Sequence, residues 1–386
     1  MRSRVLVVVL DGVGVGALPD AGPYGDAGAN TLRNVLRAAQ PSLPNLSALG
    51  LLHTLYDGTD GLAVPSGAYG RLAPAAPGTD TTAGHWELMG LAVPEPFPSF
   101  PDGVPPEVLG AFEDAIGRPT LGNRAGSGAL LLDELGAEHV RTGRPIVYTS
   151  SDSVFQVAAH EEIVPVKTLY EWCETARTVL EGPHCVARVI AKPFVGVPGT
   201  FRWTGRRRDF ALPPPGETLL DRLEEAGKSV VAIGKVAEVF AGRGVTESVR
   251  TESNREGVGA ALRAMRDGRG DLVYANLRDF DVRYGHRNDA RGFARALEEL
   301  DGLVPDLLGA LGEEDLLLLT ADHGCDPTDV SWEHTREYAP IVAAGGGVVP
   351  GTDLGTRETL ADVSAAAAAR LGVAPLAGRD LLDRPA

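Results

Sequence analysis

The stretch "VLVVVLDG" (residues 5–12) indicates the fold, because six apolar residues in a row are followed directly by Asp11 and a glycine. Apolar and β-branched residues without polar alternation are typical of a strand that is buried on both faces of its sheet. Two arginines precede the run, as they do in a secretory signal. The run is short, however, and has no small-residue cleavage site. We therefore predict a buried β-strand here.

Similar apolar runs that end in polar residues recur along the chain, at 229–235, 271–277, 315–324 and 339–346. Segments with helical periodicity lie among them, at 217–227, 254–268, 290–312 and, rich in alanine, 364–372. Buried strands interleaved with amphipathic helices are typical of a mostly parallel sheet that helices cover on both faces. The sequence therefore predicts an α/β fold.

Proline clusters mark a change of texture in the middle of the chain, at "VPEPFPSFPDGVPPE" (93–107) and "LPPPGE" (212–217). The segment between them has strand and helix patterns of its own. Domain boundaries fall in such linkers, so we predict a core formed by 1–96 and 215–386, with a smaller α/β domain inserted at 97–214. The alternative is two proline-rich surface loops within one domain.

Composition excludes several classes of protein. The chain has 386 residues, a formal net charge of −16, 44% hydrophobic and 23% charged residues. This balance is typical of a globular protein, and it argues against binding to nucleic acid or to an anionic membrane. No apolar stretch is long enough to span a membrane. Three scattered cysteines, Cys173, Cys185 and Cys325, predict no disulfide framework and fit a cytoplasmic protein.

The residues after the N-terminal strand argue against a dinucleotide-binding site there. Gly12, Gly14 and Ala17 match the G-x-G-x-x-A pattern. The residues that follow, "LPDAGPYGDAGAN" (18–30), contain too much glycine and proline for the helix that the motif requires. Another role for Asp11 is therefore needed.

Carboxylates and imidazoles gather after the predicted strands, where α/β sheets bind their ligands. Carboxylate and imidazole together favour Mn, Zn or Fe over Mg or Ca alone. Such a set can hold two metal ions that clamp a transferring phosphoryl group. The candidate ligands are Asp11, Asp281, His286, Asp322, His323 and His334. Taken singly, each of these histidines is more often structural.

The stretch "GTDTTAGHWELMG" (78–90) offers a nucleophile for that site. Its threonines and aspartate suit a helix cap, in which a side-chain oxygen accepts a backbone N–H bond. The same helix entrance can hold a phosphate on its free N–H groups, and a metal-activated hydroxyl there can act as a nucleophile. Capping and catalysis can coexist on different residues of the stretch.

Long stretches of the chain resemble the prokaryotic phosphopentomutases, a family of the alkaline phosphatase superfamily. The resemblance runs in order to about residue 345, through "LDGVGVGALPDA" (10–21), "GTDTTAGHWELMG" (78–90), "YTSSDSVFQVAAHEE" (148–162), "RVIAKPFVG" (188–196), "NLRDFDVRYGHRND" (276–289), "TADHGCDPT" (320–328) and "EHTREYAPI" (333–341). It implies an alkaline-phosphatase-like core with an inserted cap domain. It also implies interconversion of α-D-ribose 1-phosphate and ribose 5-phosphate, and of the 2-deoxyribose pair, in nucleoside salvage.

The resemblance assigns roles to individual residues. It implies that Thr81 is the nucleophile and is carried as phosphothreonine, with a sugar bisphosphate (glucose 1,6-bisphosphate or ribose 1,5-bisphosphate) as activator. It implies two Mn²⁺ ions, one held by Asp11, Asp322 and His323, and the other by Asp281, His286 and His334. Substrate-binding positions fall on Asp152, Arg188, Arg207 and Lys235, the three basic residues being suited to the distal phosphate. His85 and the threonines at 79 and 82 receive no catalytic role.

The chain departs from the family pattern at two places. The family commonly has a Gly-Thr-Asp-like run before the last histidine, where this chain reads "VSWEHTRE" (330–337), and Cys325 stands where asparagine is usual. His334 is retained, so the departures concern the loop and the metal preference rather than the ligand. We expect Cys325 to be a buried, inert thiol.

Other readings of the same residues stay open. A phosphatase or a cofactor-independent phosphoglycerate mutase uses the same core, although the latter typically carries serine in an Asn-Ser-x-x-Gly-His setting. A sulfatase is disfavoured, since the chain has no Cys-x-Pro-x-Arg site. A protein that binds metal and sugar phosphate without catalysis is a further alternative. The sequence leaves open the native metal, the preferred sugar and the oligomeric state.

Overall fold

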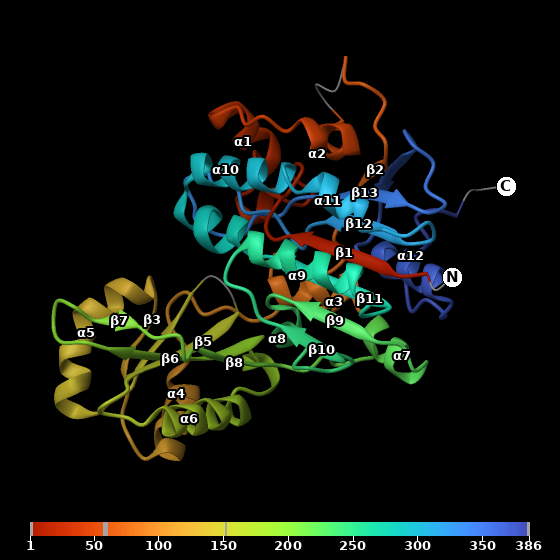
Figure 1. The fold of residues 1–386 in the computed structure, drawn as a ribbon. Helices are drawn as coiled ribbons and strands as arrows, with labels where there is room; N and C mark the ends of the chain where they lie inside the picture. The colour runs from red at the N-terminus through yellow and green to blue at the C-terminus, as the bar shows by residue number, and fades with distance from the viewer. Residues whose placement is uncertain (1–2, 57–60, 151–152, 384–386) are drawn as a thin grey trace. The chain divides into compact units, whose positions relative to one another are not determined.

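The computed structural model describes residues 3–56, 61–150 and 153–383, which divide between two compact units (Figure 1). The larger unit combines Met1–Pro96 with Pro214–Ala386, and the smaller unit is Phe97–Pro213. The sequence analysis placed the second boundary one residue later, after residue 214. Each unit has its own sheet and its own helices.

A mixed sheet forms the centre of the larger unit, with eight strands among the described residues. In order across the sheet, the strands are β10 (Glu247–Val249), β9 (Val230–Ile233), β11 (Leu272–Leu277), β1 (Val5–Leu10), β12 (Leu316–Thr320), β13 (Ala339–Gly345), β2 (Ala68–Leu72) and β14 (Asp353–Arg357). The strands from β10 to β12 are mutually parallel, β13 is antiparallel to both its neighbours, and β14 is parallel to β2. The predicted α/β class with a mostly parallel sheet is confirmed.

Helices cover this sheet in two groups. One group, whose members contact one another, is α1 (Thr31–Ala39), α2 (Pro44–Leu49), α9 (Asn254–Arg266), α10 (Ala290–Asp301) and α11 (Val304–Gly309). The others are α3 (Thr81–Leu88), α7 (Leu219–Glu225), α8 (Val236–Val239) and α12 (Asp362–Leu371), of which α12 packs on β1 and β12 (Figure 1). No helix in the described part of the chain is both long and apolar enough to cross a membrane.

The central strand behaves as its sequence predicts. Every residue of β1 is buried, with at most 1% exposure, which requires cover on both faces of the sheet. The prediction of one helix over 290–312 is wrong, because α10 ends at Asp301 and α11 begins at Val304. Gly302 follows α10, and Pro305 stands in the first turn of α11, where a missing N–H costs nothing.

The smaller unit has a sheet in the order β3 (Leu121–Ala125), β4 (Ile146–Thr149), β5 (Val154–His160), β6 (Arg188–Val195) and β7 (Arg202–Trp203), with β8 (Arg208–Ala211) also pairing with β6. Helices α4 (Pro106–Ile116) and α6 (Val166–Val179) share a core with Val147 of β4, whereas α5 (Gly128–Thr142) shares one with Ile146 and Tyr148. Successive strand residues point to opposite faces. The two helix groups therefore cover opposite faces of this sheet.

Candidate active site

Four neighbouring parallel strands of the larger unit deliver polar side chains to one edge of the sheet. Asp11 follows β1, Lys235 follows β9 by two residues, and Asp322 follows β12 by two. After β11 the chain enters a π-helical turn, η4 (Phe280–Tyr284), and then a 3₁₀ turn, η5 (Gly285–Arg287), which carry Asp281 and His286. Because carboxyl ends of parallel strands meet at one edge, residues far apart in the sequence come together here.

The side chains at this edge form two clusters of aspartate and histidine residues, which are the residue types of metal sites. In each cluster the ligand atoms lie within 4.8 Å of one another. The first cluster is Asp11, Asp322 and His323, and the second is Asp281, His286 and His334. The clusters adjoin, because the His334 ring stacks on the His323 ring at a centroid distance of 3.8 Å and on the His286 ring at 4.9 Å. The grouping is the one that the family resemblance implies.

The three histidines are held in the orientation that metal ligands need. The Nδ1 atom of His286 lies 2.7 Å from Trp332 O, that of His323 lies 3.1 Å from Gly324 O, and that of His334 lies 2.8 Å from Thr79 O. A carbonyl oxygen only accepts, so each Nδ1 carries the proton and each Nε2 carries a lone pair. Such backbone partners fix the tautomer of metal-binding histidines.

The ionised carboxylates of the site repel one another, and a bound cation would relieve this repulsion. Burial raises the pKa of Asp322 well above its usual value, and the neighbouring Asp11 carboxylate raises it further. Burial also raises the pKa of Asp11, although Lys235 opposes this effect. Burial acts in the same direction on Asp281, but His286 and His334 reverse it and hold its pKa well below the usual value. Burial lowers the pKa of His323, which keeps its imidazole neutral.

The carboxylates also retain unused acceptor capacity. Oδ1 of Asp11, Oδ1 of Asp281 and Oδ2 of Asp322 are buried and accept no hydrogen bond from the described residues. Burying a carboxylate without partners is costly, and divalent cations supply the missing interactions. Carboxylate oxygens and imidazole nitrogens are ligands of borderline metals, so these residues fit a two-metal centre.

Thr81 lies against the first cluster, at the first position of α3. Its Oγ1 atom is 2.9 Å from His323 Nε2 and 3.3 Å from Lys235 Nζ. Asp80 caps the helix, since its side chain accepts a 2.7 Å hydrogen bond from Thr82 N. The cap and the candidate nucleophile are thus neighbouring residues with separate tasks.

A glycine allows α3 to approach the strand end closely. A Cβ atom at Gly84 would lie 2.4 Å from Asp322 O, which is too close for any other residue. The close approach of Gly84 to Asp322 lets α3 carry Thr81 to the end of β12.

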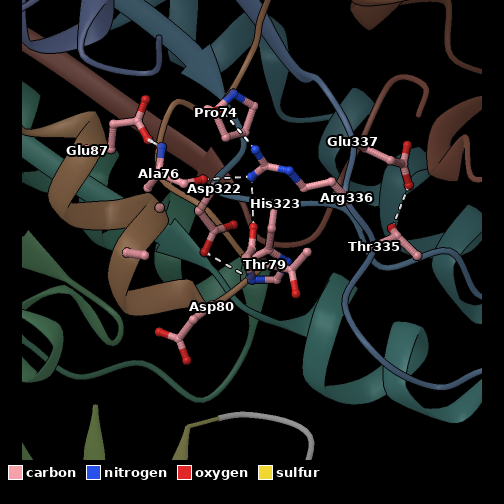
Figure 2. Close-up of a pocket in the computed structure, with 13 residues that line it drawn as sticks. Pro74, Ala76, Thr79, Asp80, Glu87, Asp322, His323, Thr335, Arg336 and Glu337 are labelled. Atoms are coloured by element: carbon pink, nitrogen blue, oxygen red, sulfur yellow. Dashed lines mark hydrogen bonds and ion pairs between the residues drawn. The ribbon is translucent and has the colours of Figure 1, made fainter. Parts of the chain in front are cut away.

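The loop before Thr81 is held from both sides by two side chains that sequence reasoning missed (Figure 2). Arg336 donates to the carbonyl oxygens of Ala76 (2.7 Å), Gly78 (2.9 Å) and Pro74 (3.2 Å). Glu87 accepts from the backbone N–H groups of residues 75 and 76, at 2.9 and 2.8 Å. Neither residue follows a strand, and the groups that they bind in this loop are backbone atoms, so the sequence holds no signal for these contacts.

Replacing the arginine should destabilise the protein. Arg336→Met leaves one buried and two partly buried carbonyl groups without their donor, so we expect the free energy of unfolding to fall by about 3 kcal/mol. Arg255→Met is the control, because Arg255 is largely exposed and pairs with an exposed glutamate; its expected change stays within about 0.5 kcal/mol. Denaturant unfolding of both variants measures the difference. Equal stabilities would contradict the role of Arg336 in holding the loop.

The predicted substrate-binding residues fall in different places. Lys235 lies beside Thr81, the candidate nucleophile, with its Nζ atom 2.5 Å from Asp11 Oδ2. Arg188 and Arg207 belong to the smaller unit, where both lie next to the buried Asp209, at 3.7 and 2.7 Å. Asp152 lies outside the described residues.

Three basic side chains gather around Asp209 on one face of the smaller sheet. Burial opposes its ionisation, yet Arg207, Arg188 and Lys192 together hold its pKa below the usual value. Burial and the nearby Arg207 lower the pKa of Lys192 to about 8. Three cationic side chains thus share one carboxylate, and the group carries excess positive charge that suits an anionic ligand.

Two further residues singled out in the sequence analysis, Cys325 and His85, are buried. Cys325 is buried, with 1% exposure, and forms no disulfide. His85 is fully buried one helical turn after Thr81, and its contacts are taken up below.

Known proteins resemble this chain over nearly its whole length. A family model described as the metalloenzyme superfamily matches residues 3–375. The phosphopentomutase of Caldanaerobacter subterraneus subsp. tengcongensis is 49% identical over 381 residues, covering 97% of this chain and 96% of the relative. The phosphopentomutase of Anaeromyxobacter dehalogenans is 51% identical over 388 residues, covering 99% of both chains.

Among solved structures, the PH0037 protein from Pyrococcus horikoshii is similar in fold, with a TM-score of 0.51 at 16% identity. The alignment covers 96% of this chain and 97% of that one. This likeness concerns the fold alone. The sequence relatives carry the assignment: the chain belongs to the phosphopentomutase family, isomerases of the metalloenzyme (alkaline phosphatase) superfamily.

Proposed function

We propose that this chain interconverts α-D-ribose 1-phosphate and ribose 5-phosphate, and the corresponding 2-deoxyribose phosphates, through a phosphothreonine at Thr81. The observation that carries the proposal is the position of Thr81 Oγ1, within 3.3 Å of both His323 Nε2 and Lys235 Nζ. A hydroxyl beside a cation and a cluster of metal-binding groups is suited to act as a nucleophile.

The reaction consists of two phosphoryl transfers. In the first, the 5-hydroxyl oxygen of ribose 1-phosphate bonds to the phosphorus on Thr81, the Oγ1–P bond breaks, and ribose 1,5-bisphosphate forms. In the second, Thr81 Oγ1 attacks the phosphorus at position 1, and the bond from that phosphorus to the sugar oxygen breaks. The proton that the sugar hydroxyl loses is balanced by the one that the product hydroxyl gains. A sugar bisphosphate such as glucose 1,6-bisphosphate supplies the first phosphoryl group.

Two divalent ions, manganese in this proposal, would be held by the two carboxylate–imidazole clusters and would stabilise the charge on the transferring group. Lys235 contributes a cation directly at Oγ1 and favours the ionised form of this oxygen. The N-terminal end of α3 adds its positive dipole at the same atom. His323 and Lys235 keep the threonine side chain directed at the clusters.

The smaller unit is proposed to bind the phosphate that is not transferred. Arg188 and Arg207 are both arranged around Asp209, and guanidinium groups bind phosphate bidentately. Asp152 is proposed to contact the sugar. Excluding water from the bisphosphate would separate a mutase from a phosphatase, and we propose that the inserted unit acts as the cap that does so.

The arginine run "GRRRDF" (205–210) provides a matched test of this subsite. Arg207→Ala removes a charge-assisted contact, and we expect the KM for ribose 1-phosphate to rise by about ten- to a hundredfold. Arg206→Ala is the control, since the Arg206 side chain is also exposed (63%, against 48% for Arg207) but pairs with Glu161 instead, and its KM should change by less than about twofold. Steady-state kinetics measures both. Similar KM values in the two variants would count against the subsite.

The reaction itself is tested with ribose 1-phosphate, Mn²⁺ and a catalytic amount of glucose 1,6-bisphosphate, while ribose 5-phosphate and free phosphate are followed together. We expect ribose 5-phosphate to accumulate with little free phosphate. Rapid release of phosphate without ribose 5-phosphate would identify a phosphatase on the same core. Binding of the sugar phosphate without turnover would identify a non-catalytic protein.

A further inference from the structure

His85 is a buried imidazole for which the proposed reaction has no use. It lies on α3 four residues after Thr81, on the same side of the helix, and is inaccessible to solvent. Isolated buried histidines are usually structural. The partners of this ring, however, connect it to a carboxylate of the first cluster.

Both nitrogens of the ring have close neighbours. Nδ1 lies 2.5 Å from the hydroxyl of Tyr274, and Nε2 lies 3.4 Å from Asp322 Oδ2. Nδ2 of the Asn276 amide lies 3.1 Å from Nε2, and Oδ1 of the same amide is buried without a hydrogen-bond partner among the described residues. Tyr274 and Asn276 are alternate residues of β11, so their side chains point to the same face of the sheet and meet the ring together.

Asp322 Oδ2 therefore faces two imidazoles at the same distance. His323 Nε2 also lies 3.4 Å from this oxygen. Nδ1 of His323 faces a carbonyl group, which requires the proton on Nδ1 and leaves a lone pair on Nε2. Nδ1 of His85 instead faces a hydroxyl group, which can donate its own proton to the ring.

His85 can therefore carry its proton on Nε2, whereas His323 carries its proton on Nδ1. The phenol of Tyr274 carries its proton at neutral pH and can donate it to Nδ1. A carboxylate that binds a metal ion is ionised and only accepts hydrogen bonds. With its proton on Nε2, the ring would accept from Tyr274 O–H at Nδ1 and point Nε2–H at Asp322 Oδ2, an oxygen 3.4 Å away that otherwise accepts no hydrogen bond from the described residues. This arrangement requires the Asn276 amide to be turned over, so that Oδ1 in place of Nδ2 faces Nε2–H and gains the partner that it lacks.

We propose that His85 is a positioning residue for Asp322, holding that carboxylate in the orientation that binds the metal ion of the first cluster. Gly12 N holds the other oxygen of Asp322, at 3.3 Å from Oδ1, so the two contacts together restrict rotation of the carboxylate. Gly84, next to His85, allows the close approach of α3 that brings the ring into place. This inference rests on the proposed metal centre.

Two isosteric variants separate positioning from packing. Glutamine places an amide nitrogen near the position of Nε2, whereas asparagine places one near Nδ1, and both side chains are polar and of similar size. The full chain is stripped with a chelator and titrated with Mn²⁺ by calorimetry. We expect His85→Asn to weaken Mn²⁺ binding by about ten- to a hundredfold, as loss of a partner of a metal ligand does. We expect His85→Gln to remain within about threefold of the wild type.

The outcomes distinguish this inference from the metal centre on which it rests. Asp322→Asn must itself weaken Mn²⁺ binding. Unchanged binding in that variant would refute the proposed metal centre. If Asp322→Asn loses affinity while His85→Asn does not, or if Gln and Asn lose it equally, the positioning role is wrong. If neither His85 variant folds, Tyr274→Phe decides, since it changes little volume and removes the donor to Nδ1. We then expect roughly threefold to tenfold weaker binding, and wild-type affinity would overturn the proposal.

Discussion

Thr81→Val should lower the rate of ribose 5-phosphate formation by about four to six orders of magnitude, as removal of an enzyme nucleophile does. Valine keeps the shape of threonine but has no hydroxyl to carry the phosphoryl group. The side chain is buried, with 1% exposure, so the substitution preserves packing. The assay follows ribose 5-phosphate from ribose 1-phosphate, with Mn²⁺ and glucose 1,6-bisphosphate present.

The neighbouring threonine supplies the control. Thr82 is also buried, and its Oγ1 atom has no hydrogen-bond partner among the described residues. Thr82→Val should therefore retain activity within about threefold, because it removes no interaction of the transition state. Mn²⁺ binding should be intact in both variants. Near-normal turnover by Thr81→Val with its metal bound would refute the nucleophile assignment.

Asp281→Asn should remove one of the two metal ions and lower the rate by about a thousandfold or more. Asp281 Oδ1 lies 3.4 Å from His286 Nε2 and 3.3 Å from His334 Nε2, so it is the carboxylate around which the second cluster is built. An amide carries no charge and binds a divalent ion far less tightly. Metal analysis after dialysis should give about one bound Mn²⁺ per chain, against about two in the wild type.

Another buried aspartate controls for the loss of a buried charge. Asp326 accepts hydrogen bonds from Asn30 N, Asn34 Nδ2 and Thr328 N, and it belongs to neither cluster. Asp326→Asn should lower stability without changing the number of bound ions. Equal metal content in the two variants would contradict the assignment of Asp281 as a ligand.

The fold was largely predictable because its signals are local. The buried strands of the larger sheet are continuous apolar runs, and β1 coincides with the first six residues of its predicted segment. The strands β2 and β14 were not predicted. Their residues "AYGRL" (68–72) and "DLGTR" (353–357) contain glycine and polar groups, and no residue of β14 is fully buried. They become strands through pairing with each other and with β13, which no local pattern indicates.

The site was predictable to the extent that its residues follow strands. Asp11, Asp322 and His323 stand at strand ends, where the sheet topology alone brings them together. Arg336 could not be assigned in this way, because its carbonyl partners lie about 260 residues earlier in the chain and carry no side-chain signal. His85 could be located but not interpreted, since its role depends on Tyr274 and Asp322, which reach it from two different strand segments.

The division of the chain has a consequence for how its substrate preference can be changed. Thr81, Lys235 and all six clustered carboxylate and imidazole side chains belong to the larger unit. The insertion between Pro96 and Pro214 contributes none of them. Substitutions in residues 97–213 therefore leave every group of the proposed phosphoryl-transfer centre in place. We expect them to change which sugar phosphate is bound and how tightly, so the inserted unit is the part of the chain to alter when a new substrate is sought.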